Sequence, residues 1–263
     1  MAVVCPWWAP PLLALQFLTR IPVTVTNGLS VDVVQIGLVR AVGWFPLVGA
    51  LIGCVTASVA VGAAMLWPVP IAIVLALAVE ARLTGAFHED AVADFCDAFG
   101  GGQTADDVRR IMKDSRIGSY GALGLVLAVV LRGALLVAVL GQFDPASAAL
   151  VIIASACFGR LLVVALMAAV PPAPAGTGLT KDIASGVGGA TLAMALATAL
   201  PALLPFASAA PLAALVTLLA GGGFILWFRA LLLRRIGGST GDCLGFTAYG
   251  AQLLLLLAAT MDA

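Results

Sequence analysis

Apolar runs of about twenty residues recur along almost the whole chain, and they constrain the fold more than any other feature. Hydrophobic residues make up 62% of the sequence and charged residues 10%, whereas a soluble domain has about 25% charged residues. A helix needs about 20 apolar residues to cross the hydrocarbon of a bilayer, so such runs are typical of transmembrane helices. We therefore predict an all-α fold, a single polytopic membrane bundle over residues 1–263 without a separate soluble domain.

The runs predict about seven spans, preceded by an interfacial N-terminal helix. Residues 6–19 are too short and too rich in proline to span, and Trp7 and Trp8 suit the headgroup zone. Pro46 predicts a kink within the first span. In chain order, the expected spans cover 35–67, about 17 residues from Ile71, 120–141, 146–170, 187–206, 211–228 and 243–261.

The second span is short, and charge returns at Glu80 before it ends. We expect this helix to project from the membrane and to carry residues 88–97 on its projecting end. A loop over 100–107 and a short amphipathic helix around Ile111 would follow. Together they form a helical segment over about 83–120, where we expect the active site. A re-entrant second span is the alternative.

Lysine and arginine set the expected orientation. They occur in four connections, at Arg20 and within 87–118, 171–186 and 229–242, which alternate with three connections that carry none. Short cytoplasmic loops of membrane proteins are enriched in these residues. We therefore expect the basic connections and the N-terminus in the cytoplasm, and the C-terminus on the other side.

Half of the charge is concentrated in one stretch, since 13 of the 26 charged side chains lie between Glu80 and Arg116. Within it, Asp90, Asp94 and Asp97 have the spacing i, i+4, i+7, which places three carboxylates on one face of a helix. Like charges in a row repel, and a divalent cation would reverse that interaction. Hard oxygen ligands favour Mg²⁺ or Mn²⁺. A solvated acidic helix face is the alternative.

His88, the only histidine, and Glu89 precede this face and could add a metal ligand, a proton carrier or a hydrogen-bond partner of a ligand. Basic side chains follow it at Arg109, Arg110, Lys113 and Arg116, with Asp114 between them. Bound Mg²⁺ beside arginine and lysine suits a pyrophosphate substrate. The three glycines at 100–102 could let the backbone approach a phosphate, and a flexible turn is an equal alternative.

Three further charged residues are candidates of a different kind. Arg132 and Arg160 lie within expected spans, where a guanidinium is costly unless it faces the bundle interior or reaches the interface. Arg160 is the better candidate for contacting an anionic substrate, while Arg132 is as well explained by pairing or by snorkelling. Asp242 lies in a glycine-rich loop before the last span, and a helix-capping role is the alternative for it.

Composition also excludes some classes. Zero net charge leaves no electrostatic footprint for nucleic acid. The five cysteines are scattered without a CxxC pair, which argues against a structural zinc site and against a disulfide framework.

Several motifs resemble those of the adenosylcobinamide-GDP ribazoletransferases, also called cobalamin (5′-phosphate) synthases. The most specific are FHEDAVADFCDAF at 87–99, RRIMKDSRIGSYG at 109–121 and GGSTGDCLG at 237–245. FLTRIP at 17–22, RAVGWFPLVGALIG at 40–53 and GTGL at 176–179 support them in the family's order. The resemblance implies a multi-pass inner-membrane enzyme that uses Mg²⁺ to join adenosylcobinamide-GDP to α-ribazole or its 5′-phosphate, with release of GMP. Whether it forms a homo-oligomer stays open.

The resemblance, together with the residue patterns, assigns roles within this sequence. The ribose 3′-hydroxyl of α-ribazole would attack the phosphorus nearer cobinamide, and GMP would leave. The expected catalytic residues are Asp90, His88, Lys113, Asp114 and Arg116. The expected substrate and phosphate contacts are Arg20, Arg40, Ser115, Arg160 and Asp242, and the expected metal ligands are Asp90, Asp94, Asp97 and Glu89.

This sequence departs from the family pattern at three positions. Ala91 and Ala98 stand where the family usually has glycine, and Tyr249 stands where a carboxylate is common, which gives Asp242 more weight. Two other functions would also explain spaced acids on membrane helices. One is a lipid enzyme like the CDP-alcohol phosphotransferases, whose motif this chain lacks, and the other is a cation-coupled transporter, in which ionisable groups lie nearer the bilayer midplane.

Overall fold

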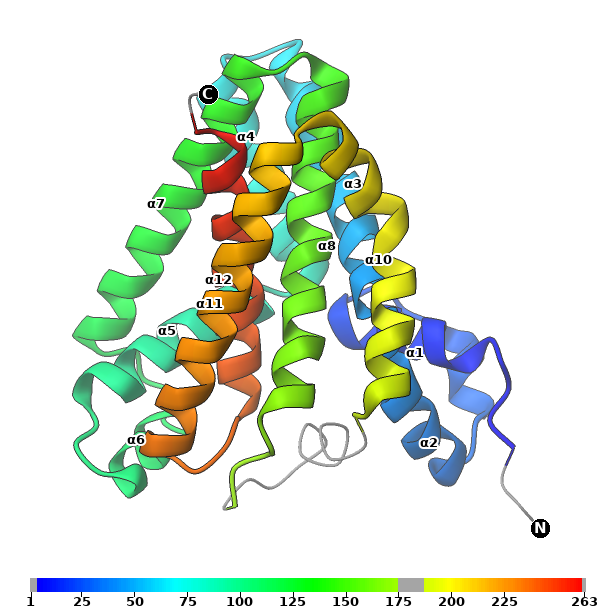
Figure 1. The fold of residues 1–263 in the computed structure, drawn as a ribbon, viewed down its shortest axis with the longest axis vertical. Coiled ribbons are helices and arrows are strands. Elements are labelled where there is room, and N and C mark those ends of the chain that lie inside the picture. The colour runs from blue at the N-terminus through cyan, green and yellow to red at the C-terminus, as the bar shows by residue number, and fades with distance from the viewer. Residues whose placement is uncertain (1–3, 175–186, 262–263) are drawn as a thin grey trace.

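The computed structural model describes residues 4–174 and 187–261, and it confirms an all-α bundle (Figure 1). The expected loop at 171–186, with Lys181 and the GTGL motif, lies mostly outside the described residues. In chain order the helices are α1 (Ala9–Leu18), η1 (Thr24–Gly28), α2 (Val31–Ala41), η2 (Val42–Trp44), α3 (Phe45–Ala64), α4 (Val69–Thr84), α5 (Phe87–Gly101), α6 (Ala105–Ile111), α7 (Ser119–Gln142), α8 (Pro145–Ala169), α10 (Gly189–Ala209), α11 (Pro211–Arg235) and α12 (Gly241–Ala259).

Local sequence signals explain where several helices begin. Ser30, Thr104, Asp144 and Thr240 cap α2, α6, α8 and α12 by accepting hydrogen bonds from backbone N–H groups of the first turn. At α6 the Asp107 carboxylate also accepts a hydrogen bond from the Thr104 backbone N–H, which completes a capping box. These caps satisfy N–H groups that have no partner within the helix.

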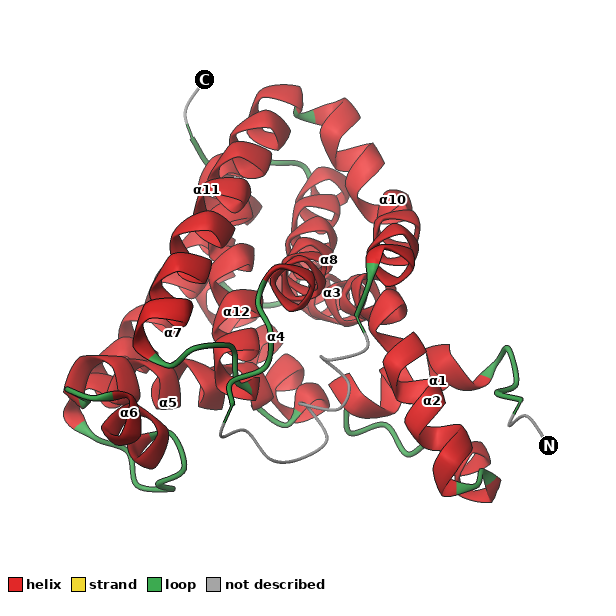
Figure 2. Ribbon diagram, turned by 60° about the horizontal axis from the view of Figure 1, so that its bottom comes forward, coloured by secondary structure: helices red, strands yellow, loops and turns green. Residues whose placement is uncertain are grey.

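Helix α8 lies at the centre of the bundle, with α3 and α12 packed against it and α7 and α11 on the outside (Figures 1 and 2). Small residues let these helices approach closely. A side chain at Gly159 of α8 would meet the Ala248 carbonyl of α12 at 2.6 Å. Such contacts are common between membrane helices, where close van der Waals packing replaces the hydrophobic effect.

Among the described residues, six helical segments are long and apolar enough to cross a membrane, and the bent pair α4–α5 brings the possible total to seven. The protein is therefore a multi-pass membrane protein, as expected. The first span is the continuous segment α2–η2–α3, and its break at Val42–Trp44 lies directly before Pro46, where the kink was predicted.

The sixth span differs from the prediction at its end. We expected it to stop near residue 228, with the basic residues in a loop, but α11 continues to Arg235 and carries Arg229 and Arg234 as well. Nothing in the segment after 228 breaks a helix before Gly237, and cations in a last turn interact favourably with the helix dipole.

The second span corrects a larger expectation. The chain does not project as one helix carrying residues 88–97, because α4 ends at Thr84 and α5 leaves at an angle of 89°. Gly85 and Ala86 both have positive φ, 76° and 58°, a left-handed conformation in which a helix cannot continue. Helix α5 therefore lies across the end of the bundle as a separate helix.

The two ends of the bundle differ in charge. The connections at 65–68, 143–144 and 210 lie at one end with the C-terminus, and α5, α6 and the connection after α11 lie at the other (Figure 1). We call the second the charged end. The three bare connections lie together at the first end as expected, whereas the arginines expected in the last basic connection lie on the final turns of α11.

Candidate active site

Helix α5 is held against α7 and α12 at the charged end. Its closest approach to α12 is at Ala91, which lies where a side chain at Gly245 would have to be. Ala91 is one of the departures from the family pattern, and the glycine opposite it explains why the extra methyl is tolerated. Phe95 continues the contact by stacking on Phe246 with ring centroids 4.0 Å apart.

Asp97 connects α5 to the start of α7. Its carboxylate accepts hydrogen bonds from the backbone N–H groups of Gly118, at 2.6 Å, and Gly121, at 2.7 Å. A side chain at Gly121 would collide with this carboxylate. Asp97 thus provides a negative charge and two acceptors at a helix N-terminus, where both stabilise the helix.

Asp90 and Asp94 instead line an open cleft of about 640 Å³ at the charged end. Arg20 and Ser115 line it as well, so four of the expected site residues meet there. The backbone of Arg20 donates to Leu83 O at 2.7 Å. The other lining residues come from the end of α1, the bend, α5 and α7 with the segment that leads into it, namely Phe17, Thr19, Thr84, Gly85, Ala86, Phe87, Ala93, Ile117 and Leu125.

The bend brings Arg20 to the acids. A side chain at Gly85 would lie 2.9 Å from Cζ of Arg20. Glycine at this position therefore serves two needs, since it adopts the left-handed conformation easily and leaves room for the guanidinium. The sequence FLTRIP signalled Arg20, but the fold was needed to place it in the same cleft as Asp90.

Burial and neighbouring acids raise the pKa of Asp94. Partial burial, followed by the charges of Asp242, Asp90 and Asp97, raises the pKa of Asp94 to about 6. Asp242 is in the first turn of α12, which Thr240 caps. Three carboxylates from α5 and one from α12 therefore lie close enough to repel, and a divalent cation among them would remove the repulsion.

The donor set suits magnesium, which the resemblance implies. Within residues 4–174 and 187–261, no group of three or more Asp, Glu, His or Cys side chains is arranged to hold a metal ion, so the expected triad of Asp90, Asp94 and Asp97 is not assembled as a ligand set. Magnesium does not require one, because it keeps several waters and binds through one or two carboxylates together with substrate phosphates. Asp90 and Asp94 supply two oxygen donors beside an open cleft, so the residues present fit this ion.

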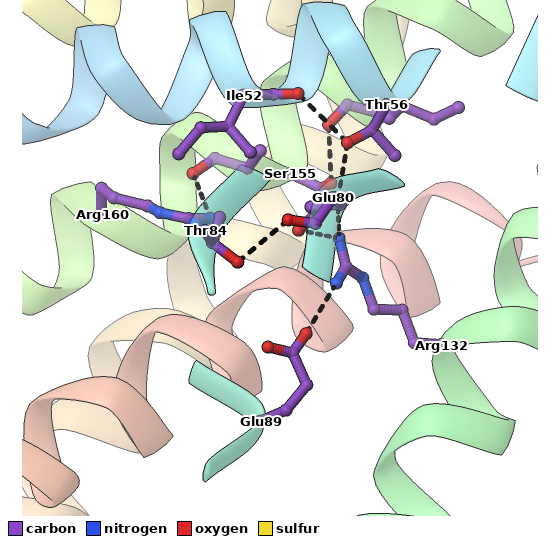
Figure 3. A network of polar contacts seen from close by, with 10 residues as sticks. Ile52, Thr56, Glu80, Thr84, Glu89, Arg132, Ser155 and Arg160 are labelled. Carbon is purple, nitrogen blue, oxygen red and sulfur yellow. Dashed lines mark hydrogen bonds and ion pairs between the residues drawn. The ribbon is translucent and has the colours of Figure 1, made fainter. Parts of the chain in front are cut away.

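Glu89 does not face the cleft. It points into the bundle, where its Oε1 lies 3.7 Å from Nη1 of Arg132 (Figure 3). Arg132 also binds Glu80, with Nη2 at 2.8 Å and 2.7 Å from the two carboxylate oxygens, and Thr56 donates to the same carboxylate at 2.6 Å. Pairing was one of the two explanations given for Arg132 and is the observed one. Glu80 was not predicted as its partner, although two opposite charges in neighbouring spans are the signal that could have found it.

His88 and Arg160 lie behind the cleft in a narrow crevice of about 30 Å³, which shares Phe17 and Phe87 with the cleft as walls. Burial, with the nearby charges of Arg160 and Arg132, holds the pKa of His88 well below its usual range, so the imidazole is neutral. Arg160 is buried, and only its Nη1 donates, at 3.3 Å to Ala156 O. Its Nε and Nη2 have no partner among the described residues.

The basic segment after α5 is mostly paired with its own acids in solvent. Arg109 pairs with Asp106 and Arg110 with Asp107, each three residues apart on α6. Arg116 binds Asp114 at 2.7 Å and holds the pKa of that carboxyl at about 2. Lys113 and Arg40 are exposed, and they are not among the residues that line the cleft. The structure thus brings Ser115 of this segment into the cleft and leaves its expected catalytic neighbours at the rim.

Comparison with known proteins gives consistent matches over almost the whole chain. The family model described as cobalamin-5-phosphate synthase matches residues 10–260. Adenosylcobinamide-GDP ribazoletransferase of Shewanella pealeana is 40% identical over 250 residues, covering 93% of both chains. The enzymes of that name from Ralstonia nicotianae and Leptothrix cholodnii are each 39% identical, covering 93% and 94% of this chain and 92% and 91% of their own. No solved structure matches.

Proposed function

Because the chain belongs to the cobalamin-5-phosphate synthase family of enzymes, we propose that it joins adenosylcobinamide-GDP to α-ribazole or its 5′-phosphate and releases GMP. The reaction transfers a phosphoryl group from a pyrophosphate to a hydroxyl. The observation that carries the proposal is the cleft that Asp90, Asp94, Arg20 and Ser115 line together. The two alternative functions, a CDP-alcohol phosphotransferase and a transporter, gain no support from the family match.

Asp90 and Asp94 would hold Mg²⁺ in this proposal. The ion would supply positive charge that neutralises a pyrophosphate and stabilises charge developing on its oxygens. Arg20 would bind phosphate oxygens from the opposite wall, since guanidinium groups form charge-assisted hydrogen bonds with phosphate. Ser115 would donate to the same group, and Lys113 and Arg116 at the rim would attract the anionic substrate before it enters.

A third carboxylate remains for the proton of the attacking hydroxyl. Asp242 lies near enough to Asp94 for its charge to raise the pKa of that group, and it is not needed as a ligand. We assign it as the general base. His88 is set back in the crevice behind Phe87 and would act by donating to or orienting a substrate group that reaches it.

The location proposed is the inner membrane, with the cleft facing the cytoplasm. The charged end carries the described basic connections, and positive residues are retained on the cytoplasmic side. The apolar spans would hold the enzyme in the bilayer, and the corrinoid nucleotide and α-ribazole would reach the cleft from the cytoplasm.

One assay tests the proposed function. Purified protein in lipid nanodiscs would receive adenosylcobinamide-GDP and α-ribazole, with Mg²⁺ or with EDTA, and corrinoid product and GMP would be quantified by chromatography. We expect equal amounts of both products with Mg²⁺ and neither with EDTA. A properly folded sample that forms no product under any divalent cation would contradict the proposal.

A further inference from the structure

Arg132 bridges the two sides of the bend between α4 and α5. It binds Glu80, which lies five residues before Gly85, and Glu89, which lies three residues after Ala86 (Figure 3). The guanidinium carbon also lies 5.4 Å from the centre of the Tyr249 ring of α12. A single side chain from α7 therefore contacts both helices that meet at the bend and the helix packed beneath them.

The bend fixes the direction of α5 only in part. Gly85 and Ala86 interrupt the helical hydrogen-bond ladder with two left-handed residues, and although the Ala86 N–H still donates to Ala81 O at 2.8 Å, the rotation of α5 about its own axis also depends on tertiary contacts. Hydrophobic packing on α12 is one such contact, and the ion pair of Glu89 with Arg132 is the polar one nearest to the bend.

Rotation of α5 decides which residues face the cleft. Successive residues of an α-helix are about 100° apart, since a turn takes 3.6 residues. When Glu89 points into the bundle toward Arg132, Asp90 and, one turn later, Asp94 face the cleft. If the helix rotated by one residue, Glu89 would lie at the cleft and Asp90 would leave it.

We infer that Glu89 is a positioning residue that acts through Asp90 and Asp94, with Arg132 as its partner, and that it is not a metal ligand. The inference rests on the proposed function for the meaning of the cleft. It replaces the earlier expectation that Glu89 belongs to the ligand set. Glu80 completes the arrangement by holding Arg132 in place while its carboxylate also accepts a hydrogen bond from Thr56.

Glu89→Gln tests the inference, because Arg132 keeps Glu80 as a partner in this variant and the fold should survive. Asp106→Asn is the matched control, since it removes one carboxylate charge from an exposed ion pair on α6. Both full-length variants would be compared with the wild type in nanodiscs by kcat, by the Mg²⁺ concentration for half-maximal activity, by melting temperature and by hydrogen–deuterium exchange of the peptide covering α5.

We expect Glu89→Gln to lower kcat about 10- to 100-fold, the range seen when a residue that orients a ligand is removed. The Mg²⁺ requirement should rise by a smaller factor than kcat falls, because both ligands remain, and exchange in α5 should become faster while other helices are unchanged. Asp106→Asn should match the wild type in all four measurements.

Two outcomes would overturn the inference. A large increase in the Mg²⁺ requirement, with kcat restored at high Mg²⁺, would make Glu89 a ligand. Unchanged exchange in α5 together with unchanged kcat would leave it without a positioning role. If the wild type itself formed no product, the exchange data would still test the control of α5 by Glu89, and the proposed function alone would fail.

Discussion

Two groups of acidic side chains lie within a few residues of each other in the sequence and behave in opposite ways. In the interior group, defined here as Glu80 and Glu89, each acid has Arg132 as its partner. In the cleft group, defined as Asp90 and Asp94, no cation of the described residues is paired with the acids, and partial burial followed by the charges of Asp242, Asp90 and Asp97 raises the pKa of Asp94 to about 6. Adjacent residues of one helix therefore serve two purposes: the interior group sets the geometry, and the cleft group is available to bind a cation.

The comparison shows why counting acids along a sequence is not enough. Desolvated charges in a bundle must be paired, whereas carboxylates at an open cleft can be held close together until a cation arrives. The predictions that follow test this division, beginning with the largest expected effect.

Loss of one residue from the cleft group should have the largest effect on activity. Asp90→Asn should lower kcat by on the order of 10²–10³, comparable with the loss of one group that stabilises charge in a transition state, while the melting temperature stays close to that of the wild type. The assay of corrinoid product and GMP measures the first quantity and thermal unfolding measures the second. Normal turnover by Asp90→Asn would show that the cleft group is misassigned.

Loss of the cation from the interior group should have the largest effect on stability. Arg132→Met leaves Glu80 buried without its partner and should destabilise the fold by about 3–5 kcal/mol, as for other broken buried ion pairs. Unfolding in mixed detergent micelles measures it. Arg109→Met removes a partly exposed arginine that pairs with the fully exposed Asp106 and should change stability very little. Similar unfolding of both variants would contradict the division.

Substitution of Asp97 should have intermediate effects on stability and activity, because this acid belongs to the same helix face as the cleft group but is bound by the backbone at the start of α7. Asp97→Asn keeps the side-chain shape but replaces one of the two oxygens that accept from Gly118 and Gly121 by an NH2 group, which cannot accept, and we expect a loss of about 1 kcal/mol. Activity should fall less than in Asp90→Asn. A complete loss of the Mg²⁺-dependent activity in this variant would instead make Asp97 a principal ligand.

The smallest expected effect concerns pH. The pKa of Asp94 is about 6 in the folded protein, above its ordinary value, so the folded state without metal binds this proton more tightly than the unfolded state does. The stability that this contributes is present at low pH and is lost as the pH rises toward and through 6. Mg²⁺ should offset the loss, because it binds the deprotonated carboxylate. The rise in melting temperature on adding Mg²⁺ should therefore be larger at about pH 7.5 than at about pH 5.5. An equal rise at both values would show that no cleft carboxylate competes with the proton.

The fold was largely predictable because long apolar runs and basic connections report spans directly. The start of α7 at Ser119 and the end of α8 at Ala169 each fall within a residue of the prediction. The bend at Gly85 and Ala86 was not predictable in the same way, since alanine gives no signal for a left-handed conformation. The continuation of α11 to Arg235 was missed because charge was taken as the end of a span.

The site was predictable as a set of residues but not as an arrangement. The spacing of Asp90 and Asp94 indicated one face of a helix, and both line the cleft. The same spacing could not show that backbone N–H groups at the start of α7 donate to the Asp97 carboxylate, or that the Glu89 side chain points inward to Arg132. Those two facts depend on contacts between segments more than 20 residues apart, which no local pattern records.

Direct binding of Mn²⁺, a paramagnetic substitute for Mg²⁺, tests the division between the two groups without relying on catalysis. Electron paramagnetic resonance would titrate Mn²⁺ into the wild type, Glu89→Gln and the double variant Asp90→Asn/Asp94→Asn in nanodiscs with a bound pyrophosphate. We predict that the wild type and Glu89→Gln bind the ion with similar affinity and that the double variant does not bind it. Loss of binding in Glu89→Gln, or full binding in the double variant, would contradict the account.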